Sequence, residues 1–497
     1  MLLGRGFMPT LLKKKLRLCT VVFSGFAVLM VSSLANSTTL TFEPIAFDGD
    51  PAPGTGTTFS LPSFSGNLNN QGEILFQSRL NVPPSLTFEI DDEAIFSSTG
   101  GTLSLVARLG DAAPGAGEGA TFGFLGRPPS LNDQGDIVFG ANLRGTGVTR
   151  GNNDAVFSDV GGTLSPVIRE GEAAPGAGEG VLFGTILDPP LNNQGEIAFT
   201  SIFLTGTGVT RGNDDAVFSG VGGSLSLVAR EGDAAPGAGE GVALGDFLGS
   251  PVLNDQGEIA FETFLTGTGV TDGNSVAIFS DVGGALVLVA REGDAAPGAG
   301  DGVLFGELND ESPSLNDQGE IAFTAVLAGN DVTNANNSAI FGDVGGTLSL
   351  VAREGDAAPG AGEGVLFGSL REPTLNNQGD IAFGALLTGT GVTNANNSGI
   401  FLESDGMLSL LVREGDIIDL GDGDLATIIS LSFGNNGFND LGQIVFSANT
   451  SNGSGLFLAS PDGIVVSPVP LPAALPLMAS GLLGLVAIAR RRKSAQA

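Results

Sequence analysis

The side chains that could do chemistry in this chain are almost all carboxylates. Its 497 residues include 54 Asp and Glu, no His, Trp or Tyr, and a single cysteine, Cys19. Without imidazole there is no Ser-His-Asp or Cys-His catalytic pair and no His-ligated zinc site. Any catalysis must therefore use carboxylates, hydroxyls or arginine.

Pairs of carboxylates recur in a loop rich in Gly and Pro. Between Gly232 and Gly241, Asp233 and Glu240 stand seven residues apart. Such a loop can bind Ca²⁺ through carboxylate and backbone oxygens, at about 10⁻⁴–10⁻³ M outside the cell. The spacing is not that of an EF-hand, and the favoured alternative is that Gly and Pro shape a turn with solvated acids. The candidate calcium ligands are Asp111, Glu118, Asp233, Glu240, Asp294, Asp301, Asp356 and Glu363.

An arginine precedes most of these loops. These arginines would either form a ring that lines an anion-binding channel or pair with the acidic residues beside them. The first unit has Phe47 at this place, so a ring of arginines would be incomplete. A repeated ion pair is therefore the favoured interpretation. The arginines in register are Arg108, Arg169, Arg230, Arg291, Arg353 and Arg413.

A glycosidase built on two carboxylates needs an acid and a base in different environments. Near-identical repeats argue against this, because catalysis requires one unit to differ from the others. Sugar stacking also commonly uses Trp or Tyr, and here Phe is the only aromatic type. The composition therefore favours a protein that is not an enzyme, and a cleft with two facing acids in one unit alone would overturn that expectation.

The elements that position these residues repeat along the chain. An Asn-x-Gln-Gly turn, loosened in the last copy, recurs at steps of 60–63 residues. Two further markers, an acidic Gly-Asp or Gly-Glu step and an aliphatic residue followed by Phe, also occur seven times, so the chain holds seven copies of one unit. The turns begin at Asn69, Asn132, Asn192, Asn254, Asn316, Asn376 and Asn439.

Within each unit the apolar residues alternate with a period of two, which predicts strands. Ile197 and Phe199 share a face, and the leucines of Ser224–Arg230 alternate with small or polar residues. Asn-x-Gln-Gly and Asp-Val-Gly-Gly predict hairpin turns, because Gly accepts a positive φ. Each unit thus supplies about four short strands, and the middle of the chain shows no helix pattern.

Seven units of four antiparallel strands predict an all-β fold, a seven-bladed β-propeller, in which radial packing protects the sheet edges. The first strand, near Thr39–Phe42, enters partway through a unit, so both termini are expected to complete the last blade. The alternative is an open β-solenoid, although capping segments are not evident in the sequence.

Both ends of the chain have the composition of export signals. Residues 1–35 combine a basic start with an uncharged apolar stretch and small residues, which predicts a signal peptide cleaved after Ala35. Residues 36–467 contain the repeats, carry no lysine and have a net charge of about −42, which repels nucleic acid. Residues 471–489 form an apolar run long enough to span a membrane, followed by basic residues.

The segment 468–497 resembles the PEP-CTERM sorting signal of Gram-negative bacteria. It combines a proline motif, a short apolar helix and an arginine cluster, although Leu471 stands where that family has Glu. The resemblance implies processing by an exosortase-type enzyme, transient membrane anchoring through the C-terminal helix, and delivery to the cell surface or an exopolysaccharide matrix. The residues that carry it are Val469, Pro470, Leu471, Pro472, Arg490, Arg491 and Arg492.

The repeats themselves resemble the NxxGxxAF tandem-repeat proteins, bacterial surface proteins with a choice of C-terminal anchors. The copy from Asn192 to Phe199 matches this pattern at every position, as do the copies beginning at Asn254, Asn316 and Asn376. The resemblance implies a repeat class and a surface location without an activity. The sequence therefore favours an exported, non-enzymatic structural or binding module with exopolysaccharide or surface components as partners. The alternatives are a calcium-binding adhesin and a surface enzyme that cleaves polysaccharide with a carboxylate pair.

Overall fold

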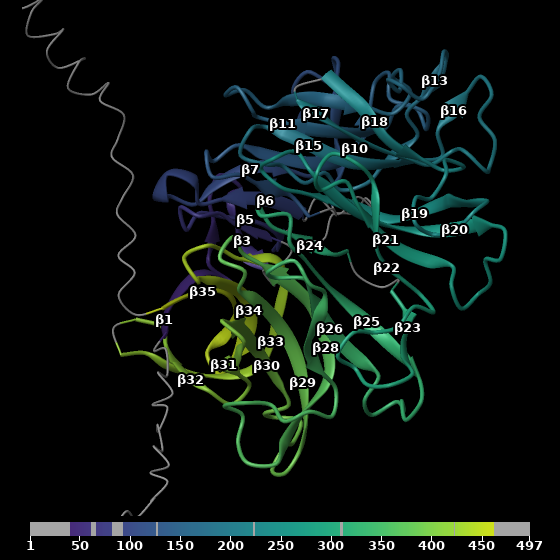
Figure 1. Cartoon of the computed structure of the whole chain (residues 1–497). Helices are drawn as coiled ribbons and strands as arrows, with labels where there is room; N and C mark the ends of the chain where they lie inside the picture. The colour runs from purple at the N-terminus through teal and green to yellow at the C-terminus, as the bar shows by residue number, and fades with distance from the viewer. Residues whose placement is uncertain are drawn as a thin grey trace, which may run out of the picture. The chain divides into compact units, whose positions relative to one another are not determined.

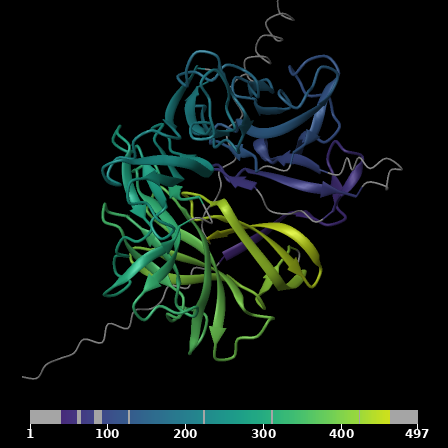
Figure 2. The same ribbon diagram turned by 90° about the vertical axis from the view of Figure 1, so that its right-hand side faces the viewer.

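The computed structural model describes residues 40–60, 66–81, 93–125, 128–221, 224–308, 312–421 and 423–461. These residues form seven antiparallel blades, numbered 1 to 7 in chain order, with a single 3-10 turn, η1 (Thr99–Gly101). Figures 1 and 2 show the blades arranged around a central axis. The predicted seven-bladed β-propeller is confirmed.

The first three blades span residues 51–230. Blade 1 contains β2 (Pro51–Ala52), β3 (Thr57–Ser60), β4 (Gly66–Leu68), β5 (Ile74–Leu80), β6 (Glu93–Ser97) and β7 (Ser104–Arg108). Blade 2 contains β8 (Ala120–Phe124), β9 (Ser130–Leu131), β10 (Ile137–Gly145), β11 (Asp154–Ser158) and β12 (Ser165–Arg169). Blade 3 contains β13 (Val181–Leu182), β14 (Thr185–Ile186), β15 (Glu196–Ile202), β16 (Thr205–Gly206), β17 (Ala216–Val221) and β18 (Ser224–Arg230).

The next three blades follow the same plan. Blade 4 contains β19 (Val242–Leu253), β20 (Ile259–Gly267), β21 (Val276–Ser280) and β22 (Val287–Arg291). Blade 5 contains β23 (Val303–Glu307), β24 (Ser314–Leu315), β25 (Ile321–Gly329), β26 (Ser338–Gly342) and β27 (Ser349–Arg353). Blade 6 contains β28 (Val365–Leu375), β29 (Ile381–Gly389), β30 (Ser398–Ser404) and β31 (Met407–Arg413).

Blade 7 joins the two ends of the repeat region. Its strands are β32 (Ile417–Asp419), β33 (Leu425–Phe438), β34 (Ile444–Thr450), β35 (Gly453–Pro461) and, from the other end, β1 (Leu40–Phe47). The last pairing is antiparallel and places Leu40 opposite Pro461 and Phe47 opposite Gly455. Both termini therefore complete one sheet, as expected, and this closure excludes the open solenoid.

Each blade has a core of Phe side chains. In blade 2 the rings of Phe139 and Phe157 stack with centroids 5.7 Å apart, and Phe122 meets Phe157 edge to face at 5.0 Å. All three are buried, and the alternation of the strands places them on one face. The stacked pair recurs in the other blades, so the same aromatic contact holds the strands of every sheet together.

The Asn-x-Gln-Gly turns meet at the axis, where they bind one another. In each turn the buried Asn accepts two backbone N–H bonds within its own turn through Oδ1; Asn192, for example, accepts from Gln194 at 3.0 Å and from Glu196 at 2.8 Å. Its Nδ2 donates to the carbonyl oxygen of Asn254 in the next blade. Gly195 adopts a φ of 75° to complete the turn.

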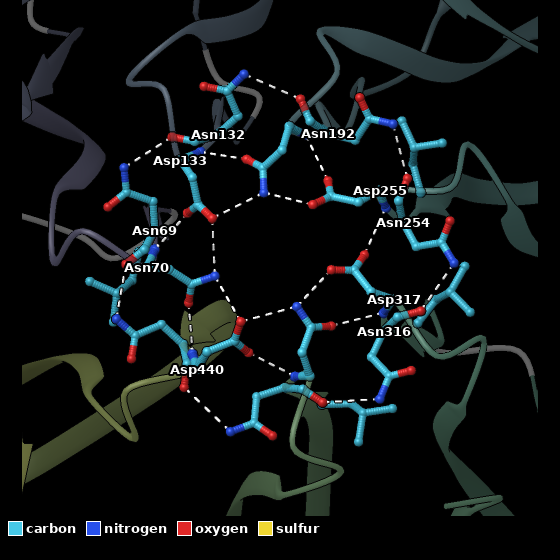
Figure 3. Close-up of a pocket in the computed structure, with 18 of the residues that line it drawn as sticks. Asn69, Asn70, Asn132, Asp133, Asn192, Asn254, Asp255, Asn316, Asp317 and Asp440 are labelled. Carbon is cyan, nitrogen blue, oxygen red and sulfur yellow. Dashed lines mark hydrogen bonds between the residues drawn. The ribbon is translucent and has the colours of Figure 1, made fainter.

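This bond between neighbouring blades forms a closed circle. Seven Nδ2 donors bind seven carbonyl oxygens at 2.9–3.4 Å, and the last bond runs from Asn439 back to Asn69. Figure 3 shows part of this ring. Because these Asn side chains are buried, each unmade bond would leave a polar group without its partner. The ring therefore fixes how the blades meet.

The two terminal segments carry several sequence predictions. The signal peptide with its cleavage after Ala35, and the sorting segment with Val469, Pro470, Leu471, Pro472, Arg490, Arg491 and Arg492, lie outside the described residues. Within the part of the chain that the structure describes, no helix is long and apolar enough to cross a membrane.

Replacing Phe457 by Ala tests the closure of blade 7. Phe457 is buried, stacks on Phe446 at 5.6 Å and meets Phe47 of β1 edge to face at 5.4 Å. We expect the free energy of unfolding in urea to fall by about 3–5 kcal/mol. Phe124→Ala, at a ring that is 45% exposed, is the control and should change it by less than about 0.5 kcal/mol. Equal effects of the two changes would contradict the closure.

Candidate functional site

The axial end of the propeller holds a shallow polar cavity of about 180 Å³. The residue after each ring Asn faces it, and a backbone N–H of each donates to the side chain of the next at 2.6–2.8 Å. Figure 3 shows these side chains around the opening. In order around the axis they are Asn70, Asp133, Asn193, Asp255, Asp317, Asn377 and Asp440.

Amide and carboxylate alternate around most of this inner ring. The Nδ2 of Asn193 donates to Asp133 at 3.0 Å and to Asp255 at 2.7 Å, so one amide bridges two carboxylates. Asp255 and Asp317 are the exception, since they are neighbours without an amide between them. Burial raises the pKa of Asp317. The backbone hydrogen bond that Asp255 donates lowers this pKa, whereas repulsion from the Asp255 carboxylate raises it. We interpret this ring as the structural hub of the blades.

The predicted calcium ligands lie away from the axis, on the loops that join consecutive blades. All eight side chains are exposed. Asp233 accepts the backbone N–H of Arg230 at 3.0 Å, while Glu240 lies at the far end of the same loop. Among the described residues there is no group of three or more acidic, His or Cys side chains placed to hold a metal ion. Calcium binding at these loops stays a prediction.

The arginines in register bind backbone carbonyl groups. Arg230 donates through Nε to the carbonyl of Asn213 at 2.8 Å and through Nη1 to that of Ala177, in the loop before blade 3. Arg169, Arg291, Arg353 and Arg413 make the same two bonds. The favoured sequence interpretation of a repeated ion pair missed these bonds. Each of these five arginines instead ties the last strand of its blade to the loop that leads into that blade.

Four carboxylates gather at the junction of blades 3 and 4. Asp214 and Asp215 precede β17, Glu231 follows β18, and Asp246 lies in β19 of the next blade. Glu231 is 7% exposed and its Oε2 accepts the backbone N–H of Asp214 at 3.0 Å, whereas Asp246 is exposed. A buried carboxyl group and an exposed one thus lie together at a blade junction.

The environment of Glu231 favours its protonated form. Burial raises the pKa of Glu231 to about 7, against the backbone hydrogen bond from Asp214 that lowers it. The charge of Asp246 and a side-chain hydrogen bond with Asp214 raise it further. A hydrogen bond between two carboxyl side chains needs a proton on one of them, and the raised pKa of Glu231 makes Glu231 the group that carries it. Burial also raises the pKa of Asp215, which accepts a backbone N–H from Phe247 of the next blade.

This junction differs from the equivalent ones. At the position of Asp214, blades 2, 4, 5 and 6 carry Asn153, Ser275, Asn337 and Asn397. At the position of Asp246, blades 2, 3, 5 and 6 carry Phe124, Thr185, Glu307 and Ser369. All four positions are acidic at the junction of blades 3 and 4, whereas the corresponding sets at the neighbouring junctions contain at least two neutral residues. The junction of blades 3 and 4 therefore differs from its neighbours in having four acidic positions.

An inserted aromatic residue borders the same cluster. Gly206 comes 14 positions after Asn192, whereas Gly267 comes 13 positions after Asn254. The extra residue interrupts the strand between β15 and β16. Phe203 occupies this break with a φ of 58°, and its ring is 63% exposed. Its backbone N–H donates to Asp215 at 3.1 Å. Bulges and positive φ values in bulky residues are concentrated at functional sites.

This cluster is not among the candidate sites predicted from the sequence, although two signals for it are visible there. One is the 14-residue spacing in the third unit, and the other is the Asp-Asp step at 214–215, where units 2, 4, 5 and 6 have Asn or Ser first. Neither signal identifies the cluster by itself, because the cluster also needs Asp246. Asp246 lies 32 residues after Asp214 in the chain and comes close to it only where blades 3 and 4 pack together.

The comparison with protein families decides the classification of the chain. The profile of DUF7453, described as a family of unknown function, matches residues 23–473. The chain belongs to the DUF7453 family. A comparison with curated proteins finds no match.

Three solved structures that are similar to this DUF7453 chain come from enzymes. The propeller domain of the Trilobed protease from Pyrococcus furiosus has 9% identity and a TM-score of 0.46, covering 84% of this chain and 99% of that one. The acylaminoacyl peptidase of Pyrococcus horikoshii has 10% identity and a TM-score of 0.42; the match covers 87% of this chain but 55% of the peptidase. A PL25 ulvan lyase has 12% identity and a TM-score of 0.39, covering 84% and 94%.

These comparisons correct one sequence interpretation. The chain was expected to be a non-enzymatic structural or binding module, whereas the propellers found similar come from a protease, a peptidase and a polysaccharide lyase. The main interpretation is therefore wrong. At 9–12% identity no site or activity passes from them to this chain, so the chemistry has to be argued from its own residues.

Replacing Asp317 by Asn tests the carboxylate contact in the inner ring. Because the folded-state pKa of Asp317 is raised, its contribution to stability is present at low pH and is lost as pH rises above about 4 through that pKa. The amide introduced by Asp317→Asn does not titrate, so the variant should gain stability relative to the wild type between about pH 4 and pH 8 in urea unfolding. Glu240→Gln, on an exposed loop, is the control. If the free energy of unfolding of Asp317→Asn differs from that of the wild type by the same amount at about pH 4 and about pH 8, the raised pKa of Asp317 is contradicted.

Proposed function

We propose that this chain is an exported glycoside hydrolase that acts on a neutral polysaccharide. Glu231 is the general acid and Asp246 the general base that activates water. The observation that supports this is the acidic junction of blades 3 and 4, where a buried carboxyl group of pKa about 7 and an exposed carboxylate lie together with two further acidic side chains. Two carboxyl groups in different environments are what this chemistry requires.

The reaction breaks the bond between the anomeric carbon and the glycosidic oxygen. Glu231 donates its proton to the departing oxygen, and the oxygen of a water molecule bonds to the anomeric carbon. Asp246 takes one proton from that water, so that the two carboxyl groups exchange their protonation states in each turnover. Asp214 acts as a positioning residue, because its backbone N–H and its side chain hold Glu231 in place.

The aromatic residues next to the cluster suit a sugar substrate. Phe203 is 63% exposed and Phe264, which packs against Gly245 beside Asp246, is 36% exposed. Exposed aromatic faces can pack on the apolar faces of sugar rings, a role that Phe fills here in the absence of Trp and Tyr. The net charge of −33 repels anionic polysaccharides, which favours a neutral one.

The cellular location is part of the same proposal. The segment 1–35 has the composition of a signal peptide, and 468–497 resembles a sorting signal, so we propose action at the bacterial cell surface or in its matrix. An exosortase-type enzyme would remove the C-terminal segment. A polysaccharide hydrolase at this location would meet its substrate outside the cell.

The catalytic assignment predicts the loss of activity in Glu231→Gln. In the full-length chain, release of reducing ends from neutral polysaccharides should fall by about 10²–10⁴-fold, because the general acid is removed. Asp246→Asn should lower the rate by a similar factor. Glu170→Gln is the matched control, since Glu170 accepts backbone N–H bonds at the equivalent place in blade 2.

The pH profile gives an independent test. Because Glu231 must be protonated, the rate should fall as pH rises above about 7.

Phe203→Ala should raise KM with a smaller effect on kcat, as expected for a side chain that binds the sugar without taking part in proton transfer. Full activity in Glu231→Gln, or no product from a panel of glucans, mannans and xylans, would contradict the proposed function.

A further inference from the structure

Besides the cavity at the axis, the structure has a cavity at the junction of blades 5 and 6, two blades along the chain from the acidic cluster. It has a volume of about 340 Å³, within the range of about 300–1,000 Å³ found for small-molecule sites. Buried Leu308, Ala325 and Leu370 form its apolar floor. Exposed Glu307 and Ser369 lie at its mouth.

Polar groups surround the cavity between its floor and its mouth. Half-buried Asn337, Ser338 and Glu354 contribute an amide, a hydroxyl and a carboxylate. The Oε2 of Glu354 accepts the backbone N–H groups of Asn337 and Ser338 at 3.2 and 3.3 Å, and the hydroxyl of Ser338 accepts that of Leu370 at 3.0 Å. These bonds to two blades hold the polar groups in fixed positions around the cavity.

This cavity occupies the same place in the repeat as the acidic cluster. Glu354 is the equivalent of Glu231, and Ser369 that of Asp246. No residue is inserted at this junction, because β25 runs without a break from Ile321 to Gly329. The junction thus keeps the glutamate of the repeat and lacks both the second carboxylate of the acid–base pair and the inserted aromatic residue.

We propose that this cavity is a second, non-hydrolytic binding site for a unit of the same neutral polysaccharide. The inference rests on the proposed function for the choice of ligand. A sugar ring carries hydroxyl groups around its edge and apolar C–H groups on its faces, which matches an apolar floor bordered by a carboxylate, an amide and hydroxyls. Two glutamates at the cavity repel an anionic ligand. Binding here would keep a long chain close to the hydrolytic junction.

The test measures oligosaccharide binding in a chain that cannot cleave its ligand. The full-length Glu231→Gln variant is titrated by calorimetry with short neutral probes, namely cellotriose, laminaritriose, mannotriose and xylotriose. We expect two binding sites per chain for one of these probes. Adding Ser369→Trp, which blocks the mouth of the cavity, should remove one of the two sites. Adding Glu354→Gln should weaken that site at least about tenfold, as expected when a half-buried charge that accepts hydrogen bonds is lost.

Matched variants separate binding from folding and from hydrolysis. Glu414→Gln changes the equivalent glutamate of blade 6, which accepts the N–H of Asn397 at 3.1 Å, and should leave both sites intact. Ser369→Trp in the otherwise unchanged chain should still hydrolyse a short chromogenic glycoside at the wild-type rate. One binding site, or two sites unaffected by Ser369→Trp, overturns the inference. If calorimetry shows two binding sites but the wild-type chain hydrolyses none of the polysaccharides, the proposed function is overturned instead.

Discussion

The propeller depends on one hydrogen bond repeated seven times, from the Nδ2 of a buried Asn to the main-chain carbonyl of its counterpart in the next blade. Each of these side chains also accepts two N–H groups of its own turn, so the residue that shapes the turn is the residue that joins the blades. A buried amide is stabilising when all of its donors and acceptors are used, and costly otherwise. The geometry at the axis is therefore strongly constrained, and with it the register of all seven sheets.

This constraint at the axis leaves the outer parts of the blades free to differ. The turns at the axis keep Asn at the first position and Gly at the fourth in every copy, whereas the position of Asp246 carries Asp, Ser, Thr, Glu or Phe from one blade to another. The bulge at Phe203 interrupts one strand, yet the Asn192 turn below it still makes its bond to Asn254. A local change in one unit can thus create a distinct site without disturbing the closure of the ring.

The fold was largely predictable from the sequence, because repetition multiplies a weak signal. One Asn-x-Gln-Gly turn is ambiguous, but six of them and a looser seventh copy at near-constant spacing, with alternating apolar residues, indicate blades. The bond from Asn439 to Asn69 was not predictable, since it exists only after the chain closes. The acidic junction was missed for a similar reason: Asp214 and Asp246 belong to different units, and comparing units one at a time conceals a site formed between two of them.

The number of blades has a consequence for the inner ring of Asn and Asp. An amide placed between two carboxylates satisfies both, so the preferred arrangement alternates the two residue types. Alternation around a circle closes without error only when the number of positions is even. With seven positions at least two like neighbours are unavoidable, and Asp255 and Asp317 are that pair. The mismatch is a matter of parity: exchanging Asp255 for Asn would only move it to the other side of that position, and only adding or removing a whole unit would abolish it.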